Sequence, residues 1–377
     1  MKKVLIVYEP LTQTGLIKSI IRNSKTSEID IVGFNINNWE FTDNENKIPW
    51  RYRLLQKLKK IPFIGVRLVS LFNTGILKLI SKDYDAIDIT FFISTFYPFA
   101  DYLIAQNKTF KITIWGSDFY RASQKDLEKK RKYFEAAKVI QVATSTMKSD
   151  ISKVYPTITD KIIVCNNGLD NLDEIQKQRQ NRGKYLNLND NGRIIVTCGY
   201  NLGRAQQHLK IIESISALPD RIKDNLHIVI PMTYGRIDTY YKEEVRHALN
   251  ESGLLFTMLD KSLSKVELAD MRLQSDIVIN IQTTDALAAS LVEHLYAGSI
   301  LIVGDWLPYS IFDENGIRYF KTDVNSLSSV IKNVVEHFTL YKELCGDNIP
   351  KAERMSSWKY KSVRFKEIYQ DLVIANK

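Results

Sequence analysis

The sequence predicts an α/β protein built from two domains. Short apolar runs alternate with helical patterns, and this alternation starts twice, at residues 3–8 and again at residues 193–199. The chain has 377 residues, which is too many for one ordinary hydrophobic core. A polar stretch, 171–192, rich in Asn, Gln, Lys and Arg, separates the two runs. We therefore expect one α/β domain on each side of this stretch.

The composition indicates a globular protein of a reducing compartment. Hydrophobic residues make up 45% of the chain and charged residues 25%. No apolar run reaches the roughly 18 residues that a membrane-spanning helix needs. The three cysteines are odd in number and widely spaced, and the five histidines show no metal-ligand spacing. We therefore expect a cytoplasmic protein with no metal site and no bound cofactor.

The first domain is predicted to alternate strands with helices. A helix is expected from Leu16 and another over 146–155. No G-x-G-x-x-G pattern follows the first strand, which argues against a dinucleotide site there. The expected strands cover residues 3–8, 29–34, 85–92, 110–115, 139–145 and 161–165.

The loop at 115–121 is the candidate site of the first domain. It follows a predicted parallel strand, and ligands of open α/β sheets lie at the carboxyl ends of strands. Gly116 permits close backbone approach. Asp118 is a candidate base or partner of an acceptor hydroxyl, and Arg121 is a candidate anion clamp. The alternative is that Asp118 or Ser117 only caps the next helix.

The segment 47–82 is strongly basic. Its pattern predicts helices broken at Pro62 and Gly65. It contains nine Lys or Arg residues, mixed with apolar and aromatic ones, and no Asp or Glu. Such stretches bind anionic surfaces, so a membrane or a lipid-linked acceptor, a nucleic acid, or merely a solvated helix pair are the alternatives. No nucleic-acid motif accompanies the charge, which favours the membrane or acceptor. The candidate contacts are Arg51, Arg53, Lys57, Lys59, Lys60 and Arg121.

The second domain repeats the alternation. Helices are expected over 240–251 and 264–274. After the first strand, a loop from Gly199 to His208 contains two glycines and Arg204, and its backbone amides and charge suit a phosphate. The alternative is an ordinary turn with two glycines. The expected strands cover residues 193–199, 226–231, 254–259, 276–280 and 299–304.

The stretch 280–304 contains the main candidate site. A helix is expected over 286–297, with Thr283 or Thr284 as its cap, Asp285 at the positive end of its dipole and Gly298 at its end. One helix side is apolar, and the other has small residues around Glu293. The apolar side comprises Leu287, Leu291, Val292 and Leu295, and the small residues are Ala286, Ala289, Ser290 and Ala297.

Small residues around one carboxylate leave room for a ligand near Glu293. Asp285 and Glu293 would lie about 12 Å apart along one helix, a span suited to two contacts with a single ligand. The alternative is that both are ordinary surface charges. The chain ends in an expected helix, 351–374, whose aromatic residues suit packing between domains.

These motifs together resemble the GT-B glycosyltransferases. Residues 166–170, Asn-Asn-Gly-Leu-Asp, are similar to the P-N-G-V-D linker of that family. Asp285 with Glu293 resembles the E-x7-E pair of its retaining members, and residues 292–298 resemble the L-E-A-M-A-x-G segment. Residues 231–235 and the Gly199–His208 loop are also similar to bacterial transferases of 4-acetamido-4,6-dideoxygalactose.

The resemblance implies two Rossmann-like α/β/α domains that face a cleft. Residues 1–168 would form the acceptor-binding domain, with a C-terminal helix, 352–377, crossing back to pack on it. Residues 169–351 would form the nucleotide-sugar domain.

The resemblance also implies roles for single residues. Glu293 would hold the ribose of a nucleotide-sugar, and Asp285 with the adjacent backbone would contact the transferred sugar. Arg204 would meet the diphosphate, Tyr234 would lie near the nucleotide, and Asp118 would face the acceptor. The implied catalytic residues are Asp118, Asp285 and Arg204, and the implied donor-binding residues are Gly199, Asn201, Gly203, Arg204, Tyr234, Thr284, Asp285 and Glu293.

One departure concerns the phosphate cations. Many members of the family have Arg directly after the glycine that is Gly199 here, and this chain has Tyr200. Arg236 and Lys261 are candidates to supply the missing charge. The departure leaves retention or inversion of the sugar open.

The resemblance thus predicts transfer of a sugar from a nucleoside-diphosphate sugar to a lipid-linked or glycan acceptor. The expected setting is bacterial surface polysaccharide synthesis at the inner face of the membrane, without nucleic acid. A sugar-nucleotide epimerase and a binding or regulatory module without transfer activity are the alternatives.

Overall fold

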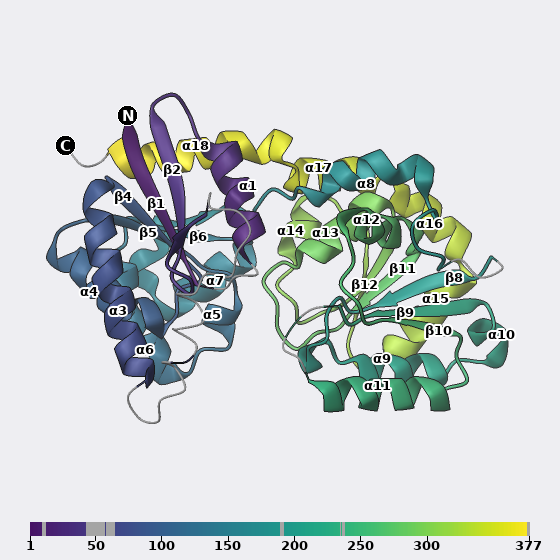
Figure 1. Cartoon of the computed structure of the whole chain (residues 1–377). Coiled ribbons are helices and arrows are strands. Elements are labelled where there is room, and N and C mark those ends of the chain that lie inside the picture. The colour runs from purple at the N-terminus through teal and green to yellow at the C-terminus, as the bar shows by residue number, and fades with distance from the viewer. Residues whose placement is uncertain are drawn as a thin grey trace. The chain divides into compact units, whose positions relative to one another are not determined.

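The computed structural model describes residues 1–9, 13–42, 57, 65–188, 192–233, 235 and 238–374 (Figure 1). The chain divides into two compact units. Unit 1 is Met1–Gly168 together with Trp358–Lys377, and unit 2 is Leu169–Ser357. Each unit is an α/β layer structure around one mainly parallel sheet.

The sheet of unit 1 has the order β3-β2-β1-β4-β5-β6-β7. All six predicted strands are confirmed, and every neighbouring pair is parallel except β2 with β3. The strand β3 was not predicted, because two residues are too few to show alternation. The strands are β1 (Lys2–Tyr8), β2 (Ile29–Asn35), β3 (Glu40–Phe41), β4 (Ala86–Thr90), β5 (Thr109–Thr113), β6 (Val139–Val142) and β7 (Ile162–Val164).

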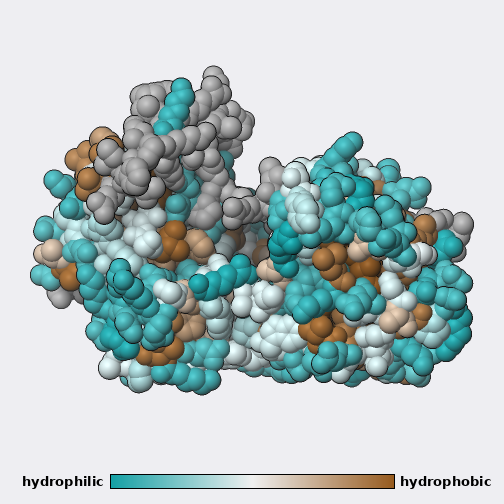
Figure 2. Space-filling view, turned by 90° about the horizontal axis from the view of Figure 1, so that it is seen from below, coloured by the Kyte–Doolittle hydropathy of each residue, from teal (hydrophilic) through white to brown (hydrophobic). Residues whose placement is uncertain are grey.

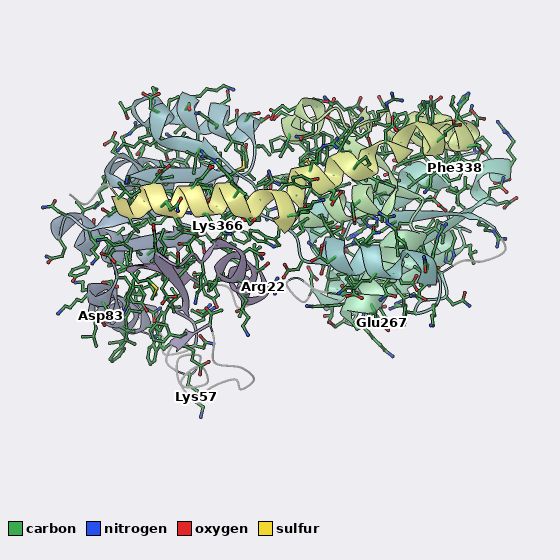
Figure 3. All side chains as sticks on the ribbon, turned by 90° about the horizontal axis from the view of Figure 1, so that it is seen from above. Arg22, Lys57, Asp83, Glu267, Phe338 and Lys366 are labelled. Carbon is green, nitrogen blue, oxygen red and sulfur yellow. The ribbon has the colours of Figure 1, made fainter. Side chains whose placement is uncertain are left out.

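The helices of unit 1 cover both faces of this sheet. On one face, α1 and α18 pack together against β1, and Figure 3 shows Lys366 on α18 and Arg22 on α1. The helices α3 and α6 lie away from α18, and both contact α4 (Figure 1). The helices are α1 (Thr14–Ser24), α3 (Gly65–Ile80), α4 (Tyr97–Ala105), α5 (Ser117–Tyr120), α6 (Gln124–Ala136), α7 (Ser145–Val154) and α18 (Trp358–Ile374).

The sheet of unit 2 is wholly parallel and has the order β10-β9-β8-β11-β12-β13. The five predicted strands are confirmed, whereas the short edge strand β13 was missed. The chain builds from β8 outward in one direction and then from β11 in the other. Ligands of open parallel sheets bind where the strand order reverses in this way. The strands are β8 (Ile194–Cys198), β9 (Leu226–Pro231), β10 (Phe256–Leu259), β11 (Ile277–Asn280), β12 (Ile300–Gly304) and β13 (Phe320–Thr322).

Besides a small cluster around Ile195 and Met271, the described residues of unit 2 form two large hydrophobic clusters, one on each face of the sheet. One contains Val196 and Ile279 with residues of α9, α11 and α15, and the other contains Val278 and Leu301 with residues of α8, α12, α13 and α17. The helices are α8 (Asn171–Gln178), α9 (His208–Ser216), α10 (Asp220–Lys223), α11 (Thr239–Glu251), α12 (Lys265–Gln274), α13 (Ala289–Ala297), α14 (Ser310–Glu314), α15 (Leu327–Glu336), α16 (Phe338–Gly346) and α17 (Asn348–Ser356).

The structure corrects two expectations about the connections. The polar stretch 171–192 is not a bare linker, because it begins with α8, whose Leu172 and Ile175 are buried against α12 and α13. The single C-terminal helix expected over 351–374 is two helices, since Ser357 adopts an extended conformation between α17 and α18. Residues 348–357 therefore belong to unit 2 and residues from 358 onward to unit 1.

Candidate functional site

The carboxyl edge of the unit 2 sheet holds a hydrogen-bonded network of loops. Gln282 lies just beyond β11, and its Oε1 accepts bonds from Tyr200 OH at 3.1 Å and Gln206 Nε2 at 2.9 Å. Its backbone carbonyl accepts a bond from Trp306 Nε1 at 2.9 Å. The loops after β8, β11 and β12 are therefore fastened together where the strand order reverses.

Asp285 belongs to a second part of this network. Tyr309 OH donates to Asp285 Oδ2 and accepts a bond from Asn280 Nδ2 at 3.0 Å. Burial raises the pKa of Asp285, and the Tyr309 hydroxyl with the Ala286 and Ala288 amides offsets part of that rise. The Asp285 carboxylate is thus held in a fixed orientation at the strand ends. Sequence reasoning assigned no role to Asn280 or Tyr309, although both follow or end predicted strands.

The start of α13 differs from the expected helix start. The helix begins at Ala289, so Asp285 is not on it, and Thr284 does not cap it. Ala288 is the N-cap and supplies no side-chain bond, which leaves first-turn amides for another partner. The Ser290 hydroxyl lies in that first turn, is 6% exposed and has no hydrogen-bond partner among the described residues. An uncapped helix start with an unused hydroxyl suits an anion.

The room expected around Glu293 is occupied. Glu293 is 5% exposed, and its carboxylate accepts bonds from Arg272 Nε at 3.0 Å and Asn171 Nδ2 at 2.7 Å. Arg272 is itself 3% exposed. The geometry therefore corrects the expectation of an open carboxylate among small residues. The role of Glu293 toward a ribose stays a prediction, and these contacts make it a buried ion pair.

This ion pair extends into a chain of side chains. Arg272 NH1 lies 2.9 Å from His294 Nε2, and His294 Nδ1 lies 3.2 Å from Ser299 Oγ. Burial and the Arg272 charge lower the pKa of His294 far below its usual range, so the imidazole is neutral. His294 Nε2 then accepts a hydrogen bond from the guanidinium. The Ser299 hydroxyl in turn donates a hydrogen bond to the Ser275 carbonyl at 2.8 Å.

The Gly199–His208 loop is tightly shaped. Gly199 has a φ of 65°, and Gln207 also lies in the left-handed region at 58° before α9 begins. The Gly203 amide donates to Asn201 Oδ1 at 2.8 Å, which closes a turn within the loop. His208 is fully buried, burial lowers its pKa to about 4, and its Nε2 has no partner among the residues described.

Arg204 is already paired in this structure. Its Nε lies 2.9 Å from Asp238 Oδ2 and its NH1 lies 2.9 Å from Glu244 Oε2. The guanidinium also lies over the Tyr241 ring, 4.6 Å from the ring centroid. A phosphate would have to compete with two carboxylates for this cation. Lys261 is exposed, whereas Tyr234 and Arg236 lie outside the described residues.

In unit 1, Asp118 lies beyond the end of β5 and is 5% exposed. Its carboxylate accepts three backbone bonds, from Trp115 at 2.9 Å, Gly116 at 2.9 Å and Phe92 at 3.0 Å. Burial raises its pKa to about 6, despite these amides and the nearby Lys130 charge. The geometry favours a carboxylate that shapes the loop, and its role toward an acceptor stays a prediction.

The remaining predicted contacts are only partly described. Arg121 and Lys57 are exposed, and Lys57 is labelled in Figure 3. Arg51, Arg53, Lys59 and Lys60 lie outside the described residues. Over the described ranges, no group of three or more His, Cys, Asp and Glu side chains is placed to hold a metal ion. Within the same ranges, no helix has the length and apolar character to cross a membrane.

Comparison with solved structures identifies the fold. A glycosyltransferase from Rickettsia africae aligns over 100% of this chain and 99% of its own, with a TM-score of 0.73 and 16% identity. Sucrose-phosphate synthase from Thermosynechococcus elongatus aligns over 100% of both chains, with a TM-score of 0.78 and 11% identity. Anabaena HepE in complex with UDP aligns over 98% of this chain and 100% of its own, with a TM-score of 0.71 and 14% identity.

No protein family model and no curated protein sequence matches the chain. At these identities the structural likeness shows the fold, and the chain has the GT-B fold. The prediction of that fold from the linker and the acidic pair is therefore confirmed.

Proposed function

We propose that this chain is a glycosyltransferase that takes a sugar from a nucleoside-diphosphate sugar. One observation supports the proposal most strongly: the polar network around Asp285 and Gln282 lies at the strand-order reversal of unit 2 in a chain of GT-B fold. HepE, which shares that fold, is described in complexes with UDP and with UDP-glucose. We infer that the donor binds unit 2 at this edge.

The contacts suggest how the donor would be held. Asp285, fixed by Tyr309, would accept hydrogen bonds from hydroxyls of the transferred sugar. The uncapped start of α13, with the Ser290 hydroxyl, would meet the diphosphate. Negative charge grows on the diphosphate as the sugar leaves, so fixed amides directed at it stabilise the transition state more than the ground state.

The acceptor is the less constrained half of the proposal. We propose a lipid-linked glycan at the cytoplasmic face of a membrane, as in surface polysaccharide synthesis, bound through unit 1. The supporting observation is the segment 47–82, with nine basic and no acidic residues. The transferred sugar would be a hexose or a deoxyaminohexose.

Calorimetric titration of the full chain with UDP and UDP-glucose tests donor binding. We expect saturable binding that Asp285→Ala weakens about tenfold or more for UDP-glucose, with a smaller effect on UDP, because Asp285 is assigned to the sugar. Asp313→Ala is the matched control, since this carboxylate is exposed and pairs with Lys321 elsewhere in unit 2. No binding by UDP, UDP-glucose or the other common nucleotide-sugars would contradict the proposal.

Turnover distinguishes transfer from other uses of the same site. With donor and a lipid-diphosphate-linked glycan, we expect release of the nucleoside diphosphate and a lengthened lipid-linked product. An isomer of the donor formed without acceptor would indicate an epimerase. Binding without any product would indicate a sensing or regulatory module.

A further inference from the structure

The helix α3 exposes large apolar side chains on its outer side. Leu71 is 69% exposed, Phe72 is 52% exposed and Leu79 is 67% exposed. Leu71 and Lys78 are seven positions apart, and so are Phe72 and Leu79, so these two pairs lie along adjacent lines of one broad helix side. Lys82 follows in the 3-10 turn Ser81–Asp83. In Figure 2, hydrophobic surface (brown) appears on unit 1 as several separate spots among hydrophilic surface.

This outer face is separate from the side of α3 that packs in unit 1. Val69 is 3% exposed and Leu77 is 1% exposed, so these two side chains form the buried side by which α3 packs in unit 1. Asn73, 3% exposed, accepts a bond from Trp39 Nε1 at 2.7 Å, which fixes the rotation of the helix. Leu71 and Leu79 are therefore additional to this core contact, and Phe72, whose ring centroid lies 6.4 Å from that of Trp39, is half exposed at its edge.

The charge on this face has one sign. From residue 47 to residue 82 the sequence has no Asp or Glu, and the first acidic residue after it is Asp83. Lys78 and Lys82 are exposed at the C-terminal end of the face. Lys78 Nζ lies 5.2 Å from the centroid of the Tyr102 ring, and the exposed Asp83 follows Lys82 in the turn after α3. A helix side that combines exposed Leu and Phe with a lysine and has no acidic residue within the helix is suited to the interface of an anionic bilayer.

A second exposed helix in unit 1 shows the contrast. Tyr360 is 42% exposed and Val363 is 59% exposed on α18, which also contains four Lys or Arg residues. However, α18 contains Glu367 and Asp371, and Arg364 NH1 bonds Glu367 Oε2 at 2.9 Å. Thus α18 presents charges of both signs, whereas α3 has no acidic residue that an anionic surface would repel.

We propose that the outer face of α3, formed by Leu71, Phe72, Lys78 and Leu79 and extended by Lys82 in the turn that follows, docks on a bilayer that contains anionic lipid. The three apolar side chains enter the boundary between headgroups and acyl chains, and the lysines lie among the headgroup phosphates. The inference deepens the proposed function, because it names the surface by which unit 1 reaches a lipid-linked acceptor. The docking itself requires no glycosyl transfer.

Sedimentation of the full chain with vesicles tests the proposal. We expect binding to phosphatidylcholine–phosphatidylglycerol vesicles, weak binding to phosphatidylcholine alone, and weakening as salt rises. Leu71→Ser/Phe72→Ser/Leu79→Ser should lower the partition coefficient about tenfold or more, and Lys78→Gln/Lys82→Gln should lower it severalfold and reduce its salt dependence. Tyr360→Ser/Val363→Ser on α18 is the matched control and should bind as the parent does.

UDP-glucose titration of each variant separates this inference from the proposed function. All variants should keep the parent's donor affinity and circular dichroism, since exposed substitutions alter stability little. Equal vesicle binding by the parent and the triple apolar variant would overturn the docking face. Equal binding of the parent to both vesicle types would overturn it as well. A parent dimer in solution that the triple variant abolishes would also overturn it, because the face would then belong to contact with a second copy. If the parent does not bind UDP-glucose, only the proposed function is contradicted.

Discussion

The carboxyl edges of the two sheets each hold an aspartate, but the two aspartates have different hydrogen-bond partners. In unit 1, the Asp118 carboxylate accepts hydrogen bonds from three backbone amides. One of these amides belongs to Phe92, which follows Phe91, a residue with a φ of 59°. In unit 2, Asp285 accepts a side-chain hydroxyl from Tyr309, which also bonds Asn280. Asp285 also receives the Ala286 and Ala288 amides, but unlike Asp118 it is only half-buried and is oriented in part by a side-chain hydroxyl. Asp118 therefore fixes a turn, whereas Asp285 remains suited to a ligand.

The two units are alike in having a buried ion pair whose carboxylate also accepts a hydrogen bond from a further helix. In unit 1, Lys111 Nζ lies 2.7 Å from Asp88 Oδ2, and Tyr369 of α18 donates to the same oxygen at 2.9 Å. In unit 2, Arg272 pairs with Glu293, and Asn171 of α8 donates to that carboxylate. Each pair fastens a helix to its unit. By this comparison Glu293 resembles Asp88 more than it resembles Asp285.

The largest expected effect comes from breaking one of these pairs. Glu293→Ala leaves the Arg272 guanidinium buried without its carboxylate, and we expect a loss of about 3–5 kcal/mol in the free energy of unfolding. Lys111→Ala in unit 1 should cost a similar amount, because it leaves Asp88 buried. Urea unfolding followed by circular dichroism measures both. The double change Arg272→Met/Glu293→Leu should recover most of the loss, since no unpaired charge remains.

This experiment also decides the role predicted for Glu293. If the double variant is stable and still binds UDP, Glu293 is structural. If Glu293→Ala unfolds at the parent's urea concentration yet no longer binds UDP, the comparison with Asp88 is wrong and a direct ribose contact is favoured.

The second expected effect is an opposite pH response of the two units. Burial raises the pKa of Asp118 to about 6 from an ordinary value of 3.8, so the folded state of unit 1 takes up a proton first. Unit 1 therefore gains stability as the pH falls from about 6 to about 4. Burial lowers the pKa of His208 to about 4 from 6.5, so the unfolded state of unit 2 takes up a proton first. His208 therefore makes unit 2 lose stability as the pH falls from about 6.5 to about 4, and the raised pKa of Asp285 opposes part of that loss.

Each group alone corresponds to roughly 3 kcal/mol across its window. Differential scanning calorimetry at several pH values should show the thermal transitions of the two units moving apart on acidification. Asp118→Asn should remove the gain in unit 1, and His208→Gln should reduce the loss in unit 2. A parent protein whose transitions move together, or variants that retain the parent's pH dependence, would show that these two groups do not set the difference.

Much of the fold follows from local patterns in the sequence. The apolar runs at 3–8 and 276–280 are long enough to identify as strands, and the resemblance at residues 166–170 places a linker near the boundary that the structure has at Gly168. The strands β3 and β13 have two and three residues, too few to show a period. The helix α8 was hidden because only Leu172 and Ile175 mark its buried side within a polar stretch.

The candidate site was less predictable, because its partners are far apart in the sequence. Asp285 is recognisable from its spacing to Glu293, but nothing local indicates that Tyr309 orients it. The partner of Glu293, Arg272, lies on another helix and resembles an ordinary surface arginine in the sequence. The small residues around Glu293 were interpreted as room for a ligand, whereas tertiary packing places Arg272 and Asn171 there.

The smallest expected effect comes from a matched pair of hydroxyl deletions. Tyr309 is 2% exposed and Tyr369 is 1% exposed, and each donates a hydrogen bond from its hydroxyl to an aspartate carboxylate. Tyr309→Phe and Tyr369→Phe should therefore each cost about 1–2 kcal/mol in the free energy of unfolding, measured in urea. The two variants should differ in ligand binding, because only Asp285 is assigned to the donor. Tyr309→Phe should weaken the binding of UDP-glucose severalfold, measured by calorimetry, while Tyr369→Phe should leave that binding unchanged. Equal donor affinity in both variants would mean that Asp285 and Asp88 play the same structural part, and the contrast between the two sheet edges would no longer hold.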